Sequence, residues 1–246
     1  MACKRSPVRS RLAPPNLMVR TMFTPYFLEQ VDSTQDFIKT LKVDKPTIVI
    51  AQSQTSGRGR QGHEWISQSG QGLWMSLAHP NLKTKDFKLI DFMSRVISVI
   101  PQNGRLGIKW PNDLVSRGAD GSLRKLGGLI GEWSNDTLFI GLGINVYSSP
   151  VTAPPALPSS SLKDEGIEIP SIKDLGLTIA THYFEQKEIE DSGVWKWPQP
   201  GMTISWENQT GVVEEWLPDQ RLQVGTASGS LVLTSNDIHG VRHLTK

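Results

Sequence analysis

The chain has 246 residues, of which 37% are hydrophobic and 20% are charged, and its formal net charge is +2. This composition is that of an ordinary globular protein with room for one large core, or for a main domain and a small one. No apolar run reaches membrane-spanning length, which excludes an integral membrane protein, and the small net charge disfavours a nucleic-acid binder.

The N-terminal segment, residues 1–22, is basic and contains prolines. Five basic residues between Lys4 and Arg20 precede the first acidic residue, Glu29. This pattern predicts a disordered basic tail without the apolar core of a secretory signal peptide. The only cysteine, Cys3, lies in this tail, which excludes an internal disulfide and a cysteine-based metal site. The default location is therefore a reducing cytoplasm.

Helices and strands are expected in mixed order over the following residues. Ser33-Thr34-Gln35-Asp36 is typical of a capping box, so a helix is predicted to begin there, and capping is the commonest role of such residues. Residues 106–115 form a strand broken by Pro111, which indicates either a bend in an edge strand or a functional site. Apolar spacing predicts further strands over residues 47–53, 73–77, 125–132 and 137–146, and helices over residues 87–100 and 171–184.

The C-terminal part has a different pattern. Residues 195–201 are rich in tryptophan and proline and are predicted to form a linker. Short alternating segments at regular spacing then predict a small β-barrel. These segments are residues 203–206, 210–215, 221–226, 230–234 and 238–244.

Polar clusters follow several predicted strands. Residues 54–65 hold three glycines, two arginines and one histidine, a composition that can bring backbone N–H groups and guanidinium groups against an anion. Alone, this loop could equally be a flexible surface turn, and the charged residues beyond it could be solvated. Five glycines in residues 125–146 indicate close approach of a ligand to the backbone, or bulges. The Walker phosphate loop, the Rossmann fingerprint and zinc-ligand spacing are absent.

Two arginines, two lysines, bare glycines and one aspartate together suit a carboxylate substrate beside a nucleoside triphosphate. A carboxylate there could hold magnesium together with the phosphates. The cationic and polar residues that carry this hypothesis are Gln54, Arg58, Arg60, Lys109, Asn112, Asp113, Lys125 and Asn145.

Five motifs, in order, resemble those of the biotin–protein ligases. They are Asp32-Ser33-Thr34, the 54–65 loop, Lys109-Trp110-Pro111-Asn112-Asp113, Lys125-Leu126-Gly127-Gly128 and Gly141-x-Gly143-Ile144-Asn145. The resemblance implies an α+β fold, in which a mixed β-sheet catalytic domain of the class II synthetase-like biotin–lipoate ligase type carries packed helices over residues 23–197. A small SH3-like β-barrel would follow over residues 198–246, where residues 235–242 resemble the end of that domain.

The resemblance also implies roles for residues. Lys125, Arg58 and Arg60 match the catalytic positions, and His63 stands where the family often has a further arginine. Gln35 stands where asparagine is common. The biotin-binding positions match Ser33, Thr34, Gln54, Gly57, Arg58, Trp74, Ser76, Lys125, Gly128 and Gly141. The ATP-binding positions match Arg60, His63, Trp65, Lys109, Asn112, Asp113, Lys125 and Asn145.

The implied activity is ATP-dependent activation of biotin to biotinoyl-AMP, with Mg²⁺, and transfer to a lysine of a biotin carboxyl carrier protein or domain of acetyl-CoA carboxylase. No helix-turn-helix pattern fits before Val31, so DNA binding is not expected. Many members of the family dimerise through the central sheet, and a homodimer is compatible with the resemblance.

Three alternatives stay open. A lipoate–protein ligase or octanoyl transferase belongs to the same superfamily, although the absence of a cysteine beyond Cys3 disfavours a cysteine-dependent transferase. A nucleic-acid-binding module would need a basic stripe with exposed aromatic residues. A catalytically silent binding protein would not need to retain Arg58, Arg60 and Lys125.

Overall fold

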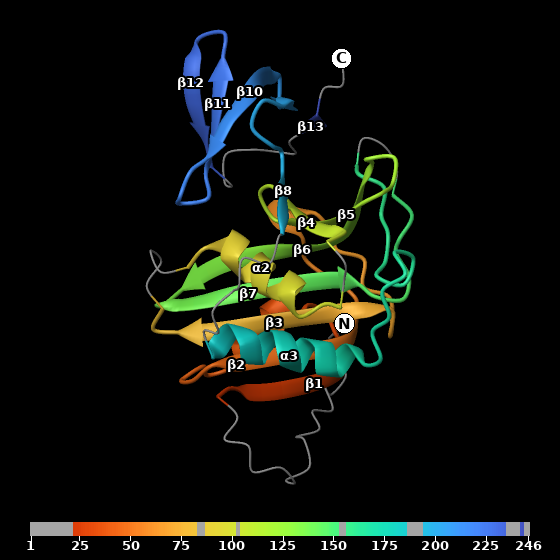
Figure 1. Ribbon diagram of the computed structural model, residues 1–246. Helices are drawn as coiled ribbons and strands as arrows, with labels where there is room; N and C mark the ends of the chain where they lie inside the picture. Colours follow the sequence, from red (N-terminus) through yellow and green to blue (C-terminus); the bar gives the residue numbers. More distant parts are fainter. Residues whose placement is uncertain are drawn as a thin grey trace, which may run out of the picture.

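The computed structural model describes residues 22–82, 87–101, 104–152, 156–185, 194–234 and 242–243. Two β-sheets dominate it (Figure 1), an eight-stranded main sheet in the order β1-β2-β3-β7-β6-β5-β4-β8 and a five-stranded sheet in the order β12-β11-β10-β9-β13. Apart from Met22, the expected basic tail lies outside the described residues, as does Cys3.

The elements have the following bounds. The main sheet comprises β1 (Thr24–Val31), β2 (Thr47–Gln54), β3 (Gly72–Pro80), β4 (Leu106–Lys109), β5 (Asp113–Arg117), β6 (Leu123–Ser134), β7 (Thr137–Asn145) and β8 (Trp195–Trp197). The helices are α1 (Thr34–Thr40), α2 (Leu89–Ser98) and α3 (Ile172–Phe184), with one 3₁₀ turn at Arg60–Gly62. The smaller sheet comprises β9 (Thr203–Trp206), β10 (Gln209–Trp216), β11 (Leu222–Thr226), β12 (Gly229–Leu233) and β13 (Arg242–His243).

Strand β2 shows how the main sheet is buried on both faces. Ile48 and Ile50 join the large hydrophobic cluster that contains residues of α2 and α3. Val49 and Ala51 point the other way and pack with Ile38 of α1. Because successive side chains of a strand alternate in direction, α2 and α3 cover one face and α1 the other. Figure 1 shows α2 and α3 in front of the sheet.

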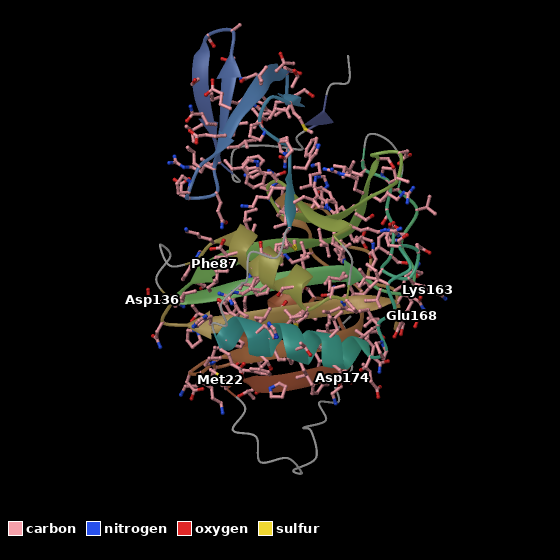
Figure 2. The ribbon with its side chains drawn as sticks, in the orientation of Figure 1. Met22, Phe87, Asp136, Lys163, Glu168 and Asp174 are labelled. Atoms are coloured by element: carbon pink, nitrogen blue, oxygen red, sulfur yellow. The ribbon has the colours of Figure 1, made fainter. Side chains whose placement is uncertain are left out.

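The long segment after β7 crosses the end of the sheet before α3 begins. Side chains of this segment, Lys163 and Glu168, lie at the opposite end of the sheet from Asp136 in the β6–β7 turn (Figure 2). The Ser171 hydroxyl caps α3 by accepting a hydrogen bond from the Asp174 N–H, as the sequence predicted.

Strand β1 has no counterpart among the strands predicted from sequence. It pairs parallel with β2 at the edge of the main sheet. Only Leu28 and Val31 are buried within it. Its apolar run, Tyr26-Phe27-Leu28, is only three residues long and is followed by the exposed Glu29 and Gln30, which is why the hydrophobic pattern misses it.

The sequence predicts one strand broken by Pro111 over residues 106–115, but the structure has two separate strands there. Strands β4 and β5 pair antiparallel, with Lys109 opposite Asp113, so Trp110, Pro111 and Asn112 form the turn between them. The proline therefore ends one strand of a hairpin. Because this turn brings Lys109 beside Asp113, the alternative of a functional site is the one that the geometry favours.

The predicted linker over residues 195–201 is partly wrong, because β8 pairs parallel with β4 and extends the main sheet. The predicted barrel is not confirmed: within the described residues the five C-terminal strands pair in linear order as an open sheet. Its core includes Trp206, Val213 and Val224, together with Trp110 from the main part of the chain. No helix in the described part of the chain is long and apolar enough to cross a membrane.

Candidate active site

A cavity of about 990 Å³ is lined by the start of α1, the loop after β2, strands β3 to β7 and the loop after β7. Its size is typical of small-molecule sites. The fold brings nearly all the residues singled out from the sequence to this cavity. They are Ser33, Thr34, Gln54, Arg58, Arg60, His63, Trp65, Ser76, Lys109, Asn112, Asp113, Lys125, Gly128, Gly141 and Asn145.

Two of the expected residues, Gly57 and Trp74, are not among those that line it. A Cβ atom at Gly57 would collide with the backbone oxygen of Trp65, so this glycine allows the two arms of the loop to meet. Trp74 is buried, its Nε1 donates to the carbonyl of Gln68 over 3.3 Å, and its ring lies edge-on to Trp65. Both residues contact Trp65: the Gly57 carbonyl accepts from its N–H, and the Trp74 ring packs against its ring.

One end of the cavity is neutral and rich in hydrogen-bonding groups. Ser76 Oγ donates to Thr34 Oγ1 over 2.9 Å, and Thr34 Oγ1 donates to Gln54 Oε1 over 3.0 Å. Gln54 Nε2 in turn donates to Ser67 Oγ over 2.7 Å. Ser33 has the capping role that its pattern predicted, since its side chain accepts from the Asp36 N–H. Thr34, Ser76 and Ser67 are buried, so this chain of dipoles is held in one orientation.

The other end is cationic. Lys125 Nζ lies 2.6 Å from Asp113 Oδ1, and Lys109 Nζ lies 3.9 Å from Asp113 Oδ2. Arg60 Nη1 donates to Asn112 Oδ1 over 3.1 Å. Lys125, Lys109 and Arg60 thus all lie close enough to interact with the single carboxylate of Asp113. The excess positive charge favours an anionic ligand at this end.

Burial destabilises the charged forms of two of these cations. Burial lowers the pKa of Lys109, the charges of Lys125 and Arg60 lower it further, and Asp113 partly offsets this. Burial likewise lowers the pKa of Arg60, with Asp113 acting in the opposite direction. A bound anion would add negative charge beside these desolvated cations and so stabilise their charged forms.

The loop between β2 and β3 is closed by backbone hydrogen bonds. The Gly59 N–H donates to the His63 carbonyl and the Trp65 N–H donates to the Gly57 carbonyl, both over 2.8 Å. Gln61 at the tip has a positive φ of 55°, a conformation that few side chains adopt readily. The loop is therefore a folded arm over the cavity, and the alternative of a flexible surface turn is not what the structure shows.

Arg58 anchors this arm to the body of the protein. Its Nη1 lies 2.5 Å from Asp36 Oδ1, and its Nη2 lies 3.1 Å from Glu132 Oε1. Burial alone would lower the pKa of Arg58, but the hydrogen bonds and charges of Asp36 and Glu132 outweigh it and raise the pKa. Glu132 also accepts from Lys39 and Gln35, so it joins the arm to α1.

Trp65 lies where strand glycines leave room for its ring. A Cβ atom at Gly143 would be 2.5 Å from Cε2 of the indole, and one at Gly128 would be 3.6 Å from Cζ3. The close approach that the glycines predicted is thus made by a side chain of this chain, and Lys125 Nζ lies 5.5 Å from the ring centre. Glycine at 143 is required for this arrangement.

Three buried polar atoms of cavity-lining residues have no hydrogen-bond partner within the described structure. They are Gln35 Oε1, Trp65 Nε1 and Asn145 Oδ1. Buried polar atoms are normally satisfied, so these three atoms of the cavity wall are positions that a bound ligand or water would complete. Gln35 Nε2 is already committed to Glu132 Oε2 over 2.8 Å, which fixes Oε1 as the remaining acceptor.

The sequence did not point to one wall of the cavity. This wall comes from the start of β6, the proline- and serine-rich loop after β7, and strand β8. Its members include Leu123, Thr152, Leu157, Ser159 and Trp197. Asn145 Nδ2 holds the loop by donating to Ser159 Oγ over 3.2 Å and to the Ser160 carbonyl over 3.1 Å. Neutral residues in a loop carry no charge or motif signal, so only the fold reveals them.

Comparison with known proteins finds similarity to the same family that the motifs resemble. Residues 27–145 match the model of the Biotin/lipoate A/B protein ligase family. The chain is 36% identical over 121 residues to the bifunctional ligase/repressor BirA of Bacillus subtilis (strain 168), which covers 45% of this chain and 36% of that protein. It is 29% identical over 140 residues to the biotin--[acetyl-CoA-carboxylase] ligase of Mycobacterium tuberculosis (strain ATCC 25618 / H37Rv), covering 50% of this chain and 47% of that protein.

The fold extends the similarity beyond these segments. The solved biotin protein ligase of Aquifex aeolicus in complex with biotin and ATP superposes with a TM-score of 0.68 at 24% identity, covering 89% of this chain and 99% of that one. The alignments to the two curated relatives span less than half of their length. Residues 27–145 are thus similar to the Biotin/lipoate A/B protein ligase family, and the named relatives that the chain resembles are biotin ligases.

Proposed function

We propose that this protein is an ATP-dependent biotin–protein ligase, which activates biotin to biotinoyl-AMP and transfers the biotinoyl group to a lysine of a carrier protein. The observation that carries the proposal is the polarity of the cavity. A neutral hydrogen-bonding end at Thr34, Gln54 and Ser76 suits a ureido ring, and a cationic end at Lys109 and Lys125 suits a carboxylate and phosphates. In the proposed arrangement, the ureido ring of biotin lies at the neutral end, and the biotin carboxylate meets the phosphates of ATP at the cationic end.

In the first step, a biotin carboxylate oxygen attacks the α-phosphorus of ATP, a P–O bond forms to give biotinoyl-AMP, and pyrophosphate leaves. The two substrates are both anionic and repel each other. Lys125 and Arg60, at the cationic end, would offset this repulsion and stabilise the charge on the phosphoryl oxygens as the bond forms. Arg58 and Arg60 lie on the arm that would shield the reactive anhydride from water.

Magnesium is the ion expected with ATP. Among the described residues, no three His, Cys, Asp or Glu side chains form a metal cage. Asp113 is the carboxylate that lies among the cavity lysines, and this set fits a magnesium ion that arrives bound to the phosphates. Such an ion would supply neutralisation of the departing pyrophosphate.

In the second step, the ε-amine of an acceptor lysine attacks the acyl carbon, an amide forms, and AMP leaves. The names of the curated relatives support a biotin carboxyl carrier protein or domain of acetyl-CoA carboxylase as the acceptor. The proposed organisation is a catalytic domain over residues 23–197 and an SH3-like domain over residues 198–246. The open sheet from β9 to β13 is what supports the second unit.

The decisive test is ATP–pyrophosphate exchange measured with biotin, with lipoate and without either acid. Exchange that requires biotin supports the proposal, and stronger exchange with lipoate would assign the chain to the lipoate branch of the family. Lipoate lacks a ureido group and cannot use the buried donors and acceptors of Thr34 and Gln54, so the geometry favours biotin. Transfer of labelled biotin to a purified carrier domain, with and without ATP, then tests the second step.

A further inference from the structure

The turn between β10 and β11, residues 217–221, is hydrogen-bonded to the main part of the protein through Gln220. Gln220 has a positive φ of 69°, and its backbone N–H donates to the Leu217 carbonyl over 2.8 Å, which closes the turn. In this conformation its carbonyl and its side chain contact two separate elements of the catalytic part. The turn belongs to the C-terminal sheet, far along the chain from the cavity residues.

The first contact is with the turn between β4 and β5. Trp110 Nε1 donates to the Gln220 carbonyl over 3.0 Å, and the Trp110 side chain is only 1% exposed. The Trp110 N–H also donates to the Trp197 carbonyl over 2.8 Å. Trp110 is thus held at its backbone N–H and at its indole Nε1. Loss of the indole bond would be costly, because it would leave a buried N–H without an acceptor.

The second contact is with the first turn of α2. Gln220 Oε1 accepts from the Ile90 N–H over 2.8 Å, and Gln220 Nε2 donates to Asp91 Oδ1 over 2.7 Å. The N-cap residue of this helix, Lys88, provides no side-chain cap. Gln220 therefore satisfies an N–H that the helix itself leaves without a partner, and this holds the Gln220 carbonyl in place.

Trp110 is followed directly by residues of the cationic end. Asn112 accepts from Arg60, and its Nδ2 donates to the Leu129 carbonyl over 2.7 Å. Asp113 is the partner of Lys125 and Lys109. Any displacement of Trp110 would move this short turn and the groups that it presents to the cavity.

The geometry points to Gln220 and Trp110 as positioning residues for the nucleotide side of the site. Gln220, from the C-terminal sheet, holds Trp110, and Trp110 sets the place of Asn112 and Asp113 against the cavity cations. The C-terminal sheet is then required for binding of ATP more than for binding of biotin, because among the described residues no hydrogen bond joins this sheet to the neutral end at Thr34 and Gln54. This inference rests on the proposed function only for the identity of the two ligands.

The test uses Trp110→Phe, which removes the indole N–H, and Gln220→Ala, which keeps the carbonyl but removes both contacts to α2. Trp206→Phe is the matched control, because Trp206 is 3% exposed in the same hydrophobic cluster but lies in β9. Amide hydrogen exchange of peptides spanning residues 109–116 is measured first, since it does not depend on activity. Both test variants should raise exchange there by about threefold or more, and the control should not.

Kinetics then show which ligand is affected. In Trp110→Phe the KM for ATP should rise about fivefold, as expected for one hydrogen bond, while the KM for biotin stays within about twofold. Gln220→Ala should show the same separation with a smaller effect, and Trp206→Phe should lower only the melting temperature. Unchanged exchange at residues 109–116 in folded Trp110→Phe and Gln220→Ala, or an equal rise of both KM values, would overturn the inference. A wild type without biotin-dependent activity would instead refute the proposed function, and the exchange measurement would still decide the positioning role.

Discussion

Lys125 and Asp113 form the shortest ion pair at the cationic end of the cavity, with 2.6 Å between Nζ and Oδ1. The pair keeps the ammonium group beside the position proposed for the two reacting anions. Lys125 is one-third exposed, so it is open to a ligand while it is held. Asp113 therefore orients Lys125 and offsets part of its positive charge. Lys109 and Arg60 keep this end of the cavity positively charged.

Lys125→Ala should lower biotin-dependent ATP–pyrophosphate exchange by about a hundredfold or more, since it removes a charge that acts on the forming phosphoryl bond. The melting temperature should change little, because Lys125 is one-third exposed and Asp113 keeps Lys109 as a second cationic neighbour, so loss of the pair costs about 1 kcal/mol. Lys163→Ala, at an exposed lysine, is the control for loss of one positive charge. Normal exchange in Lys125→Ala would remove this residue from the chemistry.

Thr34→Val tests the neutral end of the cavity. The substitution keeps the shape of the side chain but leaves Ser76 without its acceptor and Gln54 without one of its donors. The KM for biotin should rise roughly tenfold, and that for ATP should stay close to wild type. Thr40→Val is the matched control, because Thr40 ends the same helix and its hydroxyl bonds only the exposed Phe37 carbonyl. An equal change in both variants would mean that helix stability, and not ligand binding, is being measured.

Arg60→Ala tests whether the arm retains the adenylate. Arg60 lies on the arm and reaches Asn112 of the opposite wall over 3.1 Å. Its removal should speed release and hydrolysis of biotinoyl-AMP several-fold, because the arm loses a tie across the cavity. The measurement is a chase of preformed adenylate, and Gln61→Ala at the exposed tip is the control. Unchanged retention in Arg60→Ala would show that the arm closes by other contacts.

The sequence located the site through residues whose chemistry is local. Gln54 ends a buried strand and Arg58 follows it, both close to several glycines, and Lys109 and Asp113 flank a proline turn. Such groupings have a meaning before the fold is known, because strand ends and turns are where side chains and backbone can meet a ligand. The cavity confirms that these groups meet, whereas their individual roles stay predictions.

The sequence missed features that depend on distant pairing. Trp74 shares its side of β3 with Ser76, so alternation predicts that both line the cavity. Only Ser76 of the two lines it, because Trp65 from a different segment packs against Trp74 and lines the cavity in its place. Strand β8 has only three residues, and its place is set by pairing with β4 rather than by its own pattern. Leu157 lines the cavity but lies in no sequence motif that would have pointed to it. These cases depend on tertiary contacts that periodicity cannot report.

Gly143→Ala tests the space that the Trp65 ring occupies. The new Cβ atom would lie 2.5 Å from the indole, so the ring must move, and with it one wall of the cavity. We expect a loss of stability of about 1 to 2 kcal/mol and a several-fold rise in the KM for ATP. Gly131→Ala is a matched control in the neighbouring strand, where the nearest atoms would be 3.9 and 4.0 Å away. If both variants behave alike, the effect comes from strand glycines in general and not from Trp65.

The ion pair of Glu132 with Arg58 should make the anchoring of the arm sensitive to acid. Burial would raise the pKa of Glu132, but hydrogen bonds from Lys39 and Gln35 and the charges of Lys39 and Arg58 outweigh it, so the pKa is lowered from its ordinary value of 4.5. A carboxylate with a lowered pKa binds fewer protons in the folded chain than in the unfolded one. Its stabilisation is therefore complete above about pH 4.5 and is lost as the pH falls through the lower, folded-state pKa.

Glu132→Gln should thus lower the melting temperature by a constant amount between about pH 6 and 8, and this difference should shrink below about pH 4.5. Glu168→Gln, at an exposed carboxylate (Figure 2), is the control for loss of one negative charge. Thermal unfolding of the three proteins across pH 3 to 8 provides the measurement, with pH values chosen to bracket the transition. A difference between wild type and Glu132→Gln that persists unchanged at the lowest pH would mean that Glu132 acts through its shape and packing.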